Sequence, residues 1–232
     1  MPDTTPNLRD IGGHPTADGR TVATGRVLRS AVPHADDHGP DGHDWPPALV
    51  LDLRSPSESR AGHPLEAAGS RVVNVPLLAA LRPGVAPAAS LAVLYRIVLD
   101  DAAHELVRLV DEVAHETGTV LIHCAAGKDR TGIAVALLLR LEGVPRDEVL
   151  HDYQLTEHAL VEIDRRLRPP TSAPASASPG HTYPPGFAHV APEALAAVLD
   201  VWDEHPDGVG GWFVEVGGSP SSIDRLRRTL LT

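Results

Sequence analysis

Short apolar runs recur along the chain and alternate with longer amphipathic stretches. Runs rich in Leu, Val and Ile lie at 48–53, 71–75 and 119–123, each five or six residues long and bounded by polar residues. Apolar runs of that length predict strands rather than helices. Residues 21–30 predict another strand, with a turn at Gly25.

The longer stretches have helical spacing. Between 91 and 115 apolar residues recur every three or four positions, which predicts a helical stretch that Gly118 ends. Residues 131–141 predict a helix that begins directly after a glycine-containing loop. Residues 146–167 are also predicted to be helical, with a break near Tyr153. Further helices are predicted at 192–202, 210–216 and 221–231.

The order of these elements predicts the fold class. Strands interleaved with helices are typical of an α/β protein, so we expect a central mostly parallel sheet flanked by helices, with a C-terminal helical extension. Residues 1–20, 33–47 and 82–90 are rich in Pro, Gly or polar residues and are expected to be irregular. The Pro-, Ala- and Ser-rich residues 169–186 predict a flexible loop. The length of 232 residues suits one domain spanning 1–232.

Composition narrows the classes of partner. Against 20 Lys and Arg residues stand 31 Asp and Glu residues, a formal net charge of −11, which argues against nucleic-acid binding and against docking on an anionic membrane. The single cysteine, Cys124, allows no intramolecular disulfide, which is typical of a reducing compartment. No signal peptide is visible, and the apolar run 133–139 is far too short to cross a bilayer. We therefore expect a cytoplasmic protein without an integral membrane segment, while export without a signal peptide and the oligomeric state stay open.

The chemistry is concentrated in the loop between the predicted strand 119–123 and the predicted helix that follows. A turn at the carboxyl end of a buried strand is where α/β sheets bind ligands, and the N–H groups of the next helix point into it. Cys124 opens this loop and Arg130 closes it, with five residues between them. The guanidinium can hold two phosphate oxygens, and the positive surroundings favour the nucleophilic thiolate. The expected phosphate-binding residues are Ala125, Ala126, Gly127, Lys128, Asp129 and Arg130.

Two other interpretations explain the loop less well. A free cysteine is often a small buried core residue, but this leaves Gly127, Lys128 and Arg130 around it without a reason. A nucleotide-binding Walker loop needs Gly five residues before its Gly-Lys pair and Ser or Thr after the lysine. Here those positions hold Ile122 and Asp129.

The ten residues HCAAGKDRTG, from His123 to Gly132, resemble the HC-x5-R signature of protein tyrosine phosphatases. The fuller string resembles the bacterial tyrosine/lipid phosphatase branch of that superfamily. The similarity covers nearly the whole chain, although only the loop is highly specific. Other segments that look familial are 7–13 (NLRDIGG), 25–30 (GRVLRS), 52–55 (DLRS), 152–153 (DY) and the pattern from 210 to 231.

The resemblance implies a two-step reaction on phosphotyrosine, with phosphoserine, phosphothreonine or phosphoinositides as further substrates. Cys124 attacks phosphorus and forms a phosphocysteine that water hydrolyses, while Arg130 and the loop N–H groups stabilise the equatorial oxygens. No metal ion or other cofactor is expected, since Arg and the amides supply the positive field. Thr131 can place its hydroxyl on the sulfur or cap the first helical turn, and His123 can be catalytic or set the loop's hydrogen bonds.

The general acid is left open. A phosphate dianion repels a nearby carboxylate and so favours its protonated form, which makes Asp129 a suitable proton donor to the leaving oxygen. Equally, Asp129 can pair with Lys128, Arg130 or Arg54 and orient them. Relatives of this branch have been assigned an aspartate shortly after the Pro that follows the third strand, whereas residues 75–80 hold no carboxylate here. Asp52 is the second candidate, or one half of a structural pair with Arg54.

Three further features each have two interpretations. Lys128 adds a second cation for doubly charged or multiply phosphorylated substrates, or it is a solvated surface lysine. Residues 169–186 and the following helix lie where the resembling enzymes carry a lid, or they form a linker. An acidic solvated loop is favoured over a metal site, because Pro and Gly deny regular spacing to the residues His34, Asp36, Asp37, His38, Asp41, His43 and Asp44.

Three functions from different classes follow: an active phosphomonoesterase, a silent phosphate-binding module and a rhodanese-like sulfur transferase. The presence of both Cys124 and Arg130 favours the enzyme over the binding module. Arg130 and Lys128 suit phosphate better than sulfur transfer. Phosphate release, binding without turnover and thiocyanate formation distinguish the three.

Overall fold

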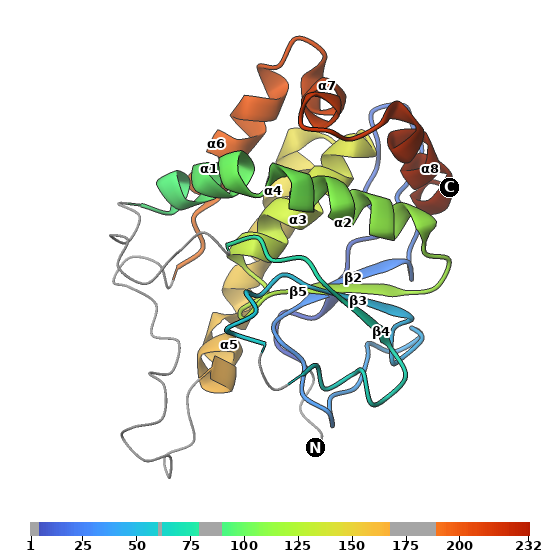
Figure 1. Ribbon diagram of the computed structural model, residues 1–232, viewed down its shortest axis with the longest axis vertical. Coiled ribbons are helices and arrows are strands. Elements are labelled where there is room, and N and C mark those ends of the chain that lie inside the picture. The colour runs from blue at the N-terminus through green and yellow to red at the C-terminus, as the bar shows by residue number, and fades with distance from the viewer. Residues whose placement is uncertain (1–4, 60–61, 79–89, 168–188) are drawn as a thin grey trace.

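A sheet of five strands organises the computed structural model, which describes residues 5–59, 62–78, 90–167 and 189–232 (Figure 1). The strands are β1 (Arg9–Asp10), β2 (Val27–Ser30), β3 (Leu49–Asp52), β4 (Arg71–Asn74) and β5 (Val120–His123). Their order across the sheet is β1-β2-β5-β3-β4. All neighbours run parallel except β1 and β2, so the predicted mostly parallel sheet is confirmed.

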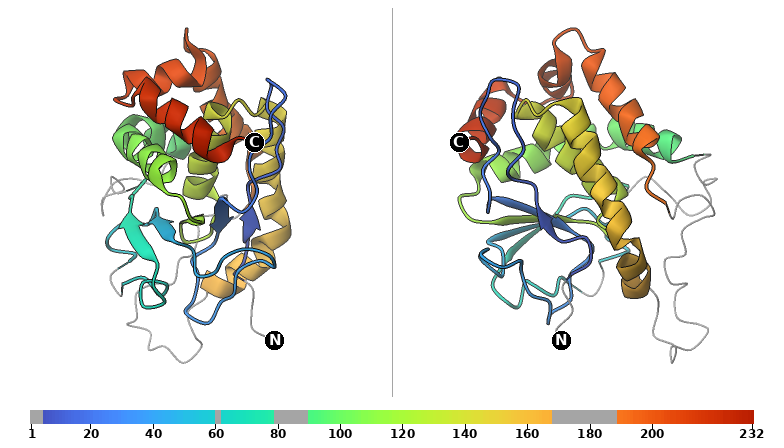
Figure 2. Two further views of the ribbon diagram at one scale, coloured as in Figure 1. Left: turned by 90° about the vertical axis from the view of Figure 1, so that its right-hand side faces the viewer. Right: turned by 180° about the vertical axis from the view of Figure 1, so that it is seen from behind.

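Both faces of the sheet are apolar. Leu51 and Ile122 belong to the main core, whereas Val50 and Leu121, one position along the same strands, join a smaller cluster on the opposite face. Figure 2 shows the helices mainly on one side of the sheet and irregular segments on the other. Because both faces are covered, the central strands β3 and β5 are nearly continuous apolar runs, which is why the sequence pattern reveals them.

Most of the helices lie on one side of the sheet, and the consecutive helices of residues 146–167 run past its edge (Figures 1 and 2). Helix α3 is buried along almost its whole length and begins at the loop that leaves β5. The helices are α1 (Leu91–Asp101), α2 (Ala103–His115), α3 (Asp129–Leu141), α4 (Arg146–Gln154), the 3-10 helix η1 (Leu155–Ala159), α5 (Leu160–Leu167), α6 (Pro192–Asp203), α7 (Gly208–Glu215) and α8 (Pro220–Leu230).

The helical stretch predicted at 91–115 is two helices. They meet at Ala102, whose φ of −119° and ψ of 21° are not helical. Helix α1 packs on α6 and α2 packs on α8, so the break lets each follow a different partner. The sequence pattern hides the break because the buried residues Leu99, Ala102 and Leu106 keep helical spacing across it.

Gly118 does not end α2 in the way predicted. The helix is followed by Glu116, whose carboxylate accepts the N–H groups of Thr117 and Gly118. A Cβ at Gly118 would lie 2.5 Å from the Cβ of Ala48. Glycine is therefore needed here for close packing rather than for a left-handed turn.

The N-terminal part of the chain also differs from prediction. Residues 21–30 contribute only the short β2, because Thr21 and Val22 make isolated bridges and a turn at Gly25, with a φ of 78°, separates them from the strand. Residues 1–20 were expected to be irregular, yet they provide β1. A strand of two residues is too short to leave a periodic pattern.

Other predicted features agree with the structure. Helix α4 ends at Gln154 and η1 follows, which confirms the predicted break near Tyr153. The three C-terminal helices are confirmed within a few residues of their predicted ends. The predicted loops at 169–186 and, except for Ser90, at 82–90 lie outside the described residues. None of the helices in the described ranges is both long and apolar enough to span a bilayer.

The contact between α3 and α4 generates a stability prediction. A Cβ at Gly132, in the first turns of α3, would lie 2.8 Å from the ring of Tyr153 in α4. We expect Gly132→Ala to lower the free energy of unfolding by about 1–3 kcal/mol in urea denaturation, because the added methyl overpacks this contact.

Gly210→Ala is the matched control, since Gly210 also lies inside a helix, but its added Cβ would meet only Ile223, at 3.7 Å. We expect it to raise the free energy of unfolding by about 0.5–1 kcal/mol through helix propensity. A stabilising Gly132→Ala would contradict the packing seen between α3 and α4.

Candidate active site

The loop from Cys124 to Arg130 leaves the central strand of the sheet. In the parallel register, Ser30 of β2 and Asp52 of β3 lie on either side of His123, the last residue of β5. The carboxyl ends of three parallel strands therefore meet directly below the loop, where α/β sheets bind ligands. The predicted position of the loop, between a buried strand and a helix, is confirmed.

Carbonyl groups along the loop are held from outside it. The Cys124 carbonyl is 3.0 Å from Nδ1 of His123, and the Ala125 carbonyl accepts the N–H of Val32 at 3.0 Å. The Gly127 carbonyl accepts two side-chain donors, Nδ2 of Asn7 at 2.8 Å and Nη2 of Arg29 at 2.9 Å. Side chains far apart in the sequence thus fix the path of this short segment.

These anchors also orient the N–H groups. A planar trans peptide carries its N–H on the side opposite its C=O, so each carbonyl drawn outward turns the next N–H inward. The carbonyls that precede Ala125, Ala126 and Gly127 are those of Cys124, Ala125 and Ala126, the last of which accepts Nδ2 of Asn7 at 3.5 Å. The three N–H groups that follow them donate to no other described residue. With the N-terminus of α3, they form a concave row of donors that suits an anion.

Gly127 is required by this path. Its φ is +66°, which favours glycine, and a Cβ would lie 2.2 Å from the carbonyl oxygen of Ser30 in β2. The loop therefore passes over the neighbouring strand at a distance that only glycine permits.

Buried ion pairs hold the side chains that anchor the loop. Arg29 is fully buried and paired with Asp152 of α4, which also accepts the Nε–H of Arg9 at 2.9 Å. Burial alone would raise the pKa of Asp152, but the two guanidinium groups lower it to about 2, so it stays ionised. The family resemblance included the segments 7–13, 25–30 and 152–153, but it did not indicate that their side chains anchor the loop.

Arg130 is held by a residue that sequence reasoning missed. Its Nη1 and Nη2 groups donate to the two carboxylate oxygens of Glu58, at 2.8 and 2.9 Å. Burial alone would lower the pKa of Arg130, but the bonds to Glu58 and the nearby Cys124 raise it above its usual value. Glu58 lies in the irregular segment after β3, where no motif marks it.

Cys124 and Thr131 are both buried. Cys124 is 3% exposed and Thr131 is 0% exposed. The Thr131 hydroxyl makes no hydrogen bond with another described residue. Helix α3 begins at Asp129 without a side-chain cap, so the alternative in which Thr131 caps the first turn is wrong. A hydroxyl on the sulfur stays a prediction.

Lys128 and Asp129 form an ion pair. Lys128 is 1% exposed, which excludes the alternative of a solvated surface lysine, and its Nζ lies 2.6 Å from Oδ1 of Asp129. The same oxygen accepts the hydroxyl of Tyr95 at 2.7 Å. Tyr153 lies 2.7 Å from Tyr95 and accepts the N–H of Ala191, just before α6. Asp129 is therefore paired as one alternative predicted, and the two tyrosines were missed.

Comparison with known proteins identifies the family. A profile described as the tyrosine phosphatase family matches residues 2–232. The chain belongs to the tyrosine phosphatase family. The predicted assignment to this family of hydrolases is therefore confirmed.

Three individual relatives are 33% to 35% identical to this chain over part of its length, and each is longer than this chain. A tyrosine-protein phosphatase of Nostoc commune is 34% identical over 49% of this chain and 40% of its own length. A putative tyrosine-protein phosphatase of Cupriavidus necator is 35% identical over 65% of this chain and 60% of its own. The triple specificity protein phosphatase PtpB of Mycobacterium tuberculosis is 33% identical over 48% and 44%. The matched part of this tyrosine phosphatase family member thus spans 40% to 60% of these relatives.

Asp52 and Arg54 form the structural pair that was one of two predicted alternatives. Arg54 donates to both carboxylate oxygens of Asp52, with its Nη2 at 2.7 Å. Burial alone would raise the pKa of Asp52, but the hydrogen bonds and the positive charge of Arg54 bring it below its usual value. Asp52 therefore stays ionised at neutral pH.

The acidic loop at 33–47 is more ordered than predicted. Asp37 is 5% exposed and accepts the hydroxyl of Thr5 and the guanidinium of Arg166 in α5. His43 lies 2.9 Å from Asp10. The loop thus ties α5 and the N-terminal segment together through Asp37 and His43.

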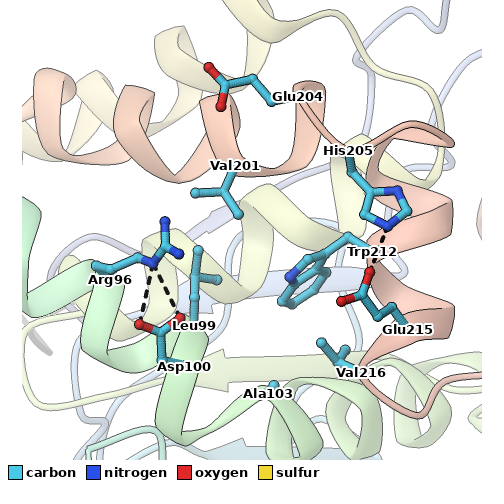
Figure 3. A pocket seen from close by; sticks show the side chains of 10 residues that line it. All are labelled: Arg96, Leu99, Asp100, Ala103, Val201, Glu204, His205, Trp212, Glu215 and Val216. Carbon is cyan, nitrogen blue, oxygen red and sulfur yellow. Dashed lines mark hydrogen bonds and ion pairs between the residues drawn. The ribbon is translucent and has the colours of Figure 1, made fainter.

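A second hollow lies away from the loop, between α1, α6 and α7 (Figure 3). Its volume is about 520 Å³, and Trp212 and Leu99 line its apolar part. Most of the charged groups at its edge are paired, since Arg96 pairs with Asp100 and His205 with Glu215. It is not lined by any residue of the loop from Cys124 to Arg130, which we call the phosphate loop.

The anchoring of Gly127 generates a prediction. Asn7, at a φ of 61° that Asn and Asp tolerate, can be replaced by Asp with little change of shape. We expect Asn7→Asp to weaken binding of inorganic phosphate at least about tenfold in calorimetry, because a carboxylate oxygen would face the Gly127 carbonyl.

Ser70→Ala is the control, because the buried Ser70 hydroxyl donates to the carbonyl of Pro47 at the other end of the sheet. This variant should lose about 1 kcal/mol of stability and keep its phosphate affinity. Unchanged phosphate affinity in a folded Asn7→Asp protein would show that this anchor does not shape the loop.

Proposed function

We propose that this chain is a cysteine-dependent phosphomonoesterase that acts on phosphotyrosine through a phosphocysteine intermediate. The observation that carries the proposal is the loop itself. Its inward-facing N–H groups, its closing Arg130 and its thiol belong to one segment that side chains hold from outside. Such a site stabilises a phosphate dianion beside a sulfur nucleophile.

In the first step, the Cys124 thiolate attacks phosphorus in line with the ester oxygen. A sulfur–phosphorus bond forms, the bond to the ester oxygen breaks, and that oxygen leaves after receiving a proton. Arg130 and the loop N–H groups hold the equatorial oxygens as charge redistributes. Glu58 accepts one N–H of each Nη atom and the Leu53 carbonyl accepts from Nη1 at 3.4 Å, so Nε and the second N–H of Nη2 are the Arg130 donors that can face the phosphate.

In the second step, water attacks phosphorus and the sulfur leaves as a thiolate. A donor close to the sulfur speeds this departure, because it stabilises the negative charge that develops there. The buried Thr131 hydroxyl, which has no other partner among the described residues, is our candidate for that donor. Metal ions are not required, because the positive field comes from Arg130 and backbone amides.

Asp129 is our candidate for the general acid. Its Oδ1 already accepts Lys128 and Tyr95, which leaves the second carboxylate oxygen to carry a proton. Asp52 suits the role poorly, since its lowered pKa and its pairing with Arg54 keep it ionised. The alternative is that Asp129 only orients Lys128.

The substrate range is proposed from the site and the relatives together. The relative PtpB is described as having triple specificity, which supports phosphoserine, phosphothreonine and phosphoinositides as further substrates. Asp129 offsets the charge of Lys128. Lys128 therefore attracts a multiply phosphorylated substrate less strongly than its position in the sequence implies. We therefore place phosphotyrosine first.

One domain carries this activity in our proposal. A single cluster of buried side chains includes residues of the sheet, of the helices next to it and of the C-terminal helices. The loop residues are thus supported by elements from both ends of the described chain. The role of 169–186 as a lid lies outside the described residues.

The proposal predicts hydrolysis of p-nitrophenyl phosphate without added metal and in the presence of a chelator. Cys124→Ser should abolish turnover and keep phosphate binding, because only the nucleophile is lost. Release of nitrophenolate is the measurement. Phosphate binding without turnover by folded, reduced wild type would instead support a binding module.

The acid role of Asp129 predicts a dependence on the leaving group. Asp129→Asn should lower kcat about 100-fold on a phosphotyrosine peptide and much less on p-nitrophenyl phosphate, whose phenolate leaves without help. The ionisation of this acid should also be missing from the pH–rate profile of the variant. Equal losses on both substrates with an unchanged profile would assign Asp129 to orienting Lys128.

A further inference from the structure

Two histidines and an aspartate lie directly behind the loop. His123 is 0% exposed, His63 is 7% exposed and Asp52 is 2% exposed. The Nε2 atoms of the two imidazoles are 2.9 Å apart, and Asp52 lies 3.8 Å from His123. His63 belongs to the irregular segment between β3 and β4 and was not singled out by its sequence.

The partners at both ends of the histidine pair fix where the protons are. The backbone N–H of Leu65 can only donate, so Nδ1 of His63, 3.2 Å away, is an acceptor and the ring proton is on Nε2. The Cys124 carbonyl can only accept, so Nδ1 of His123 carries a proton and its Nε2 is an acceptor. His63 therefore donates to His123, and His123 donates to Cys124.

We propose that His63 is a positioning residue for the phosphate loop, which it controls by holding His123 in the tautomer that anchors the Cys124 carbonyl. That carbonyl and the N–H of Ala125 belong to one planar peptide. His63 thus orients the first N–H donor beside the sulfur without touching substrate. The inference rests on the proposed function for its effect on turnover, while the hydrogen-bond relay stands on geometry.

The relay requires both histidines to be neutral. A second proton on Nε2 of His123 would face the Nε2–H of His63 across 2.9 Å. A second proton on Nδ1 of His63 would face the N–H of Leu65 across 3.2 Å. Among the described residues, the charged groups that act on the pair are Asp52, Arg54 and Arg130, and the Cys124 carbonyl acts through its hydrogen bond with His123. Burial and then His123 lower the pKa of His63 to about 4, and burial also lowers the pKa of His123. The relay is therefore intact at neutral pH and breaks as the pH falls towards 4.

A metal site explains the same three side chains less well. Their ligand atoms lie within 4.8 Å of one another, as metal ligands do. Coordination through Nε2 of His63 would move its proton to Nδ1, which already faces the N–H of Leu65. Asp52 would also have to release Arg54. The relay needs neither change.

The first test compares His63→Leu, which removes the donor, with His63→Gln, whose amide can still donate to His123. We expect kcat on p-nitrophenyl phosphate to fall about tenfold in the leucine variant, with KM nearly unchanged, and to stay within about threefold in the glutamine variant. His115→Leu, at an exposed histidine of α2, is the control and should match wild type. Equal losses in both His63 variants, or no loss in either, would overturn the proposal.

The pH dependence separates positioning from simple support of the fold. Glutamine does not titrate, so the kcat ratio of wild type to His63→Gln should be constant above about pH 6 and fall as the pH approaches 4. A ratio that stays flat down to pH 4 in folded protein would contradict the relay.

A second test does not depend on turnover or on a variant that folds. Nitrogen-15 NMR of the ring nitrogens in wild type at pH 7 should show a proton on Nε2 of His63 and on Nδ1 of His123. The opposite tautomer of either ring would overturn the relay. If the expected tautomers are found but the chain hydrolyses no phosphate ester, the proposed function fails and the relay remains.

Discussion

Carbonyl groups of the phosphate loop are drawn outward, and much of the surrounding structure serves to hold them there. Asn7 and Arg29 bind the Gly127 carbonyl, and Val32 binds that of Ala125. Inside the loop, Lys128 pairs with Asp129, but this contact does not hold the carbonyls of Cys124, Ala125 and Gly127. Anchors from the N-terminal segment, β2 and β5 select the path of the loop instead, and planar peptides convert outward carbonyls into inward N–H donors.

The anchors also explain how a chain with a net charge of −11 can present a site for a dianion. Arg29 and Arg130 are buried, and each is paired with a carboxylate, Arg29 with Asp152 and Arg130 with Glu58. Each pair costs desolvation, but a buried guanidinium without a partner would cost far more. The carboxylates hold the cations in position, and the net charge says little about the field at the loop.

Strands, helices and the loop were predictable because each leaves a local signal: apolar runs for β3 and β5, helical spacing for α3, and a Cys-to-Arg spacing for the site. The break at Ala102 left none, since apolar spacing continues across it. Glu58 and His63 were missed for another reason. Both come from irregular segments, and only the tertiary fold brings them to Arg130 and His123.

We propose that this loop makes Cys124 a nucleophile towards phosphate esters. The most direct measurement is acid quenching of wild-type protein during turnover of a phosphotyrosine peptide, followed by mass spectrometry of the peptide that contains Cys124. We predict phosphate on Cys124, present only while substrate remains and absent in Cys124→Ser. Turnover without any phosphorylated Cys124 peptide, or phosphate on another residue, would contradict the account.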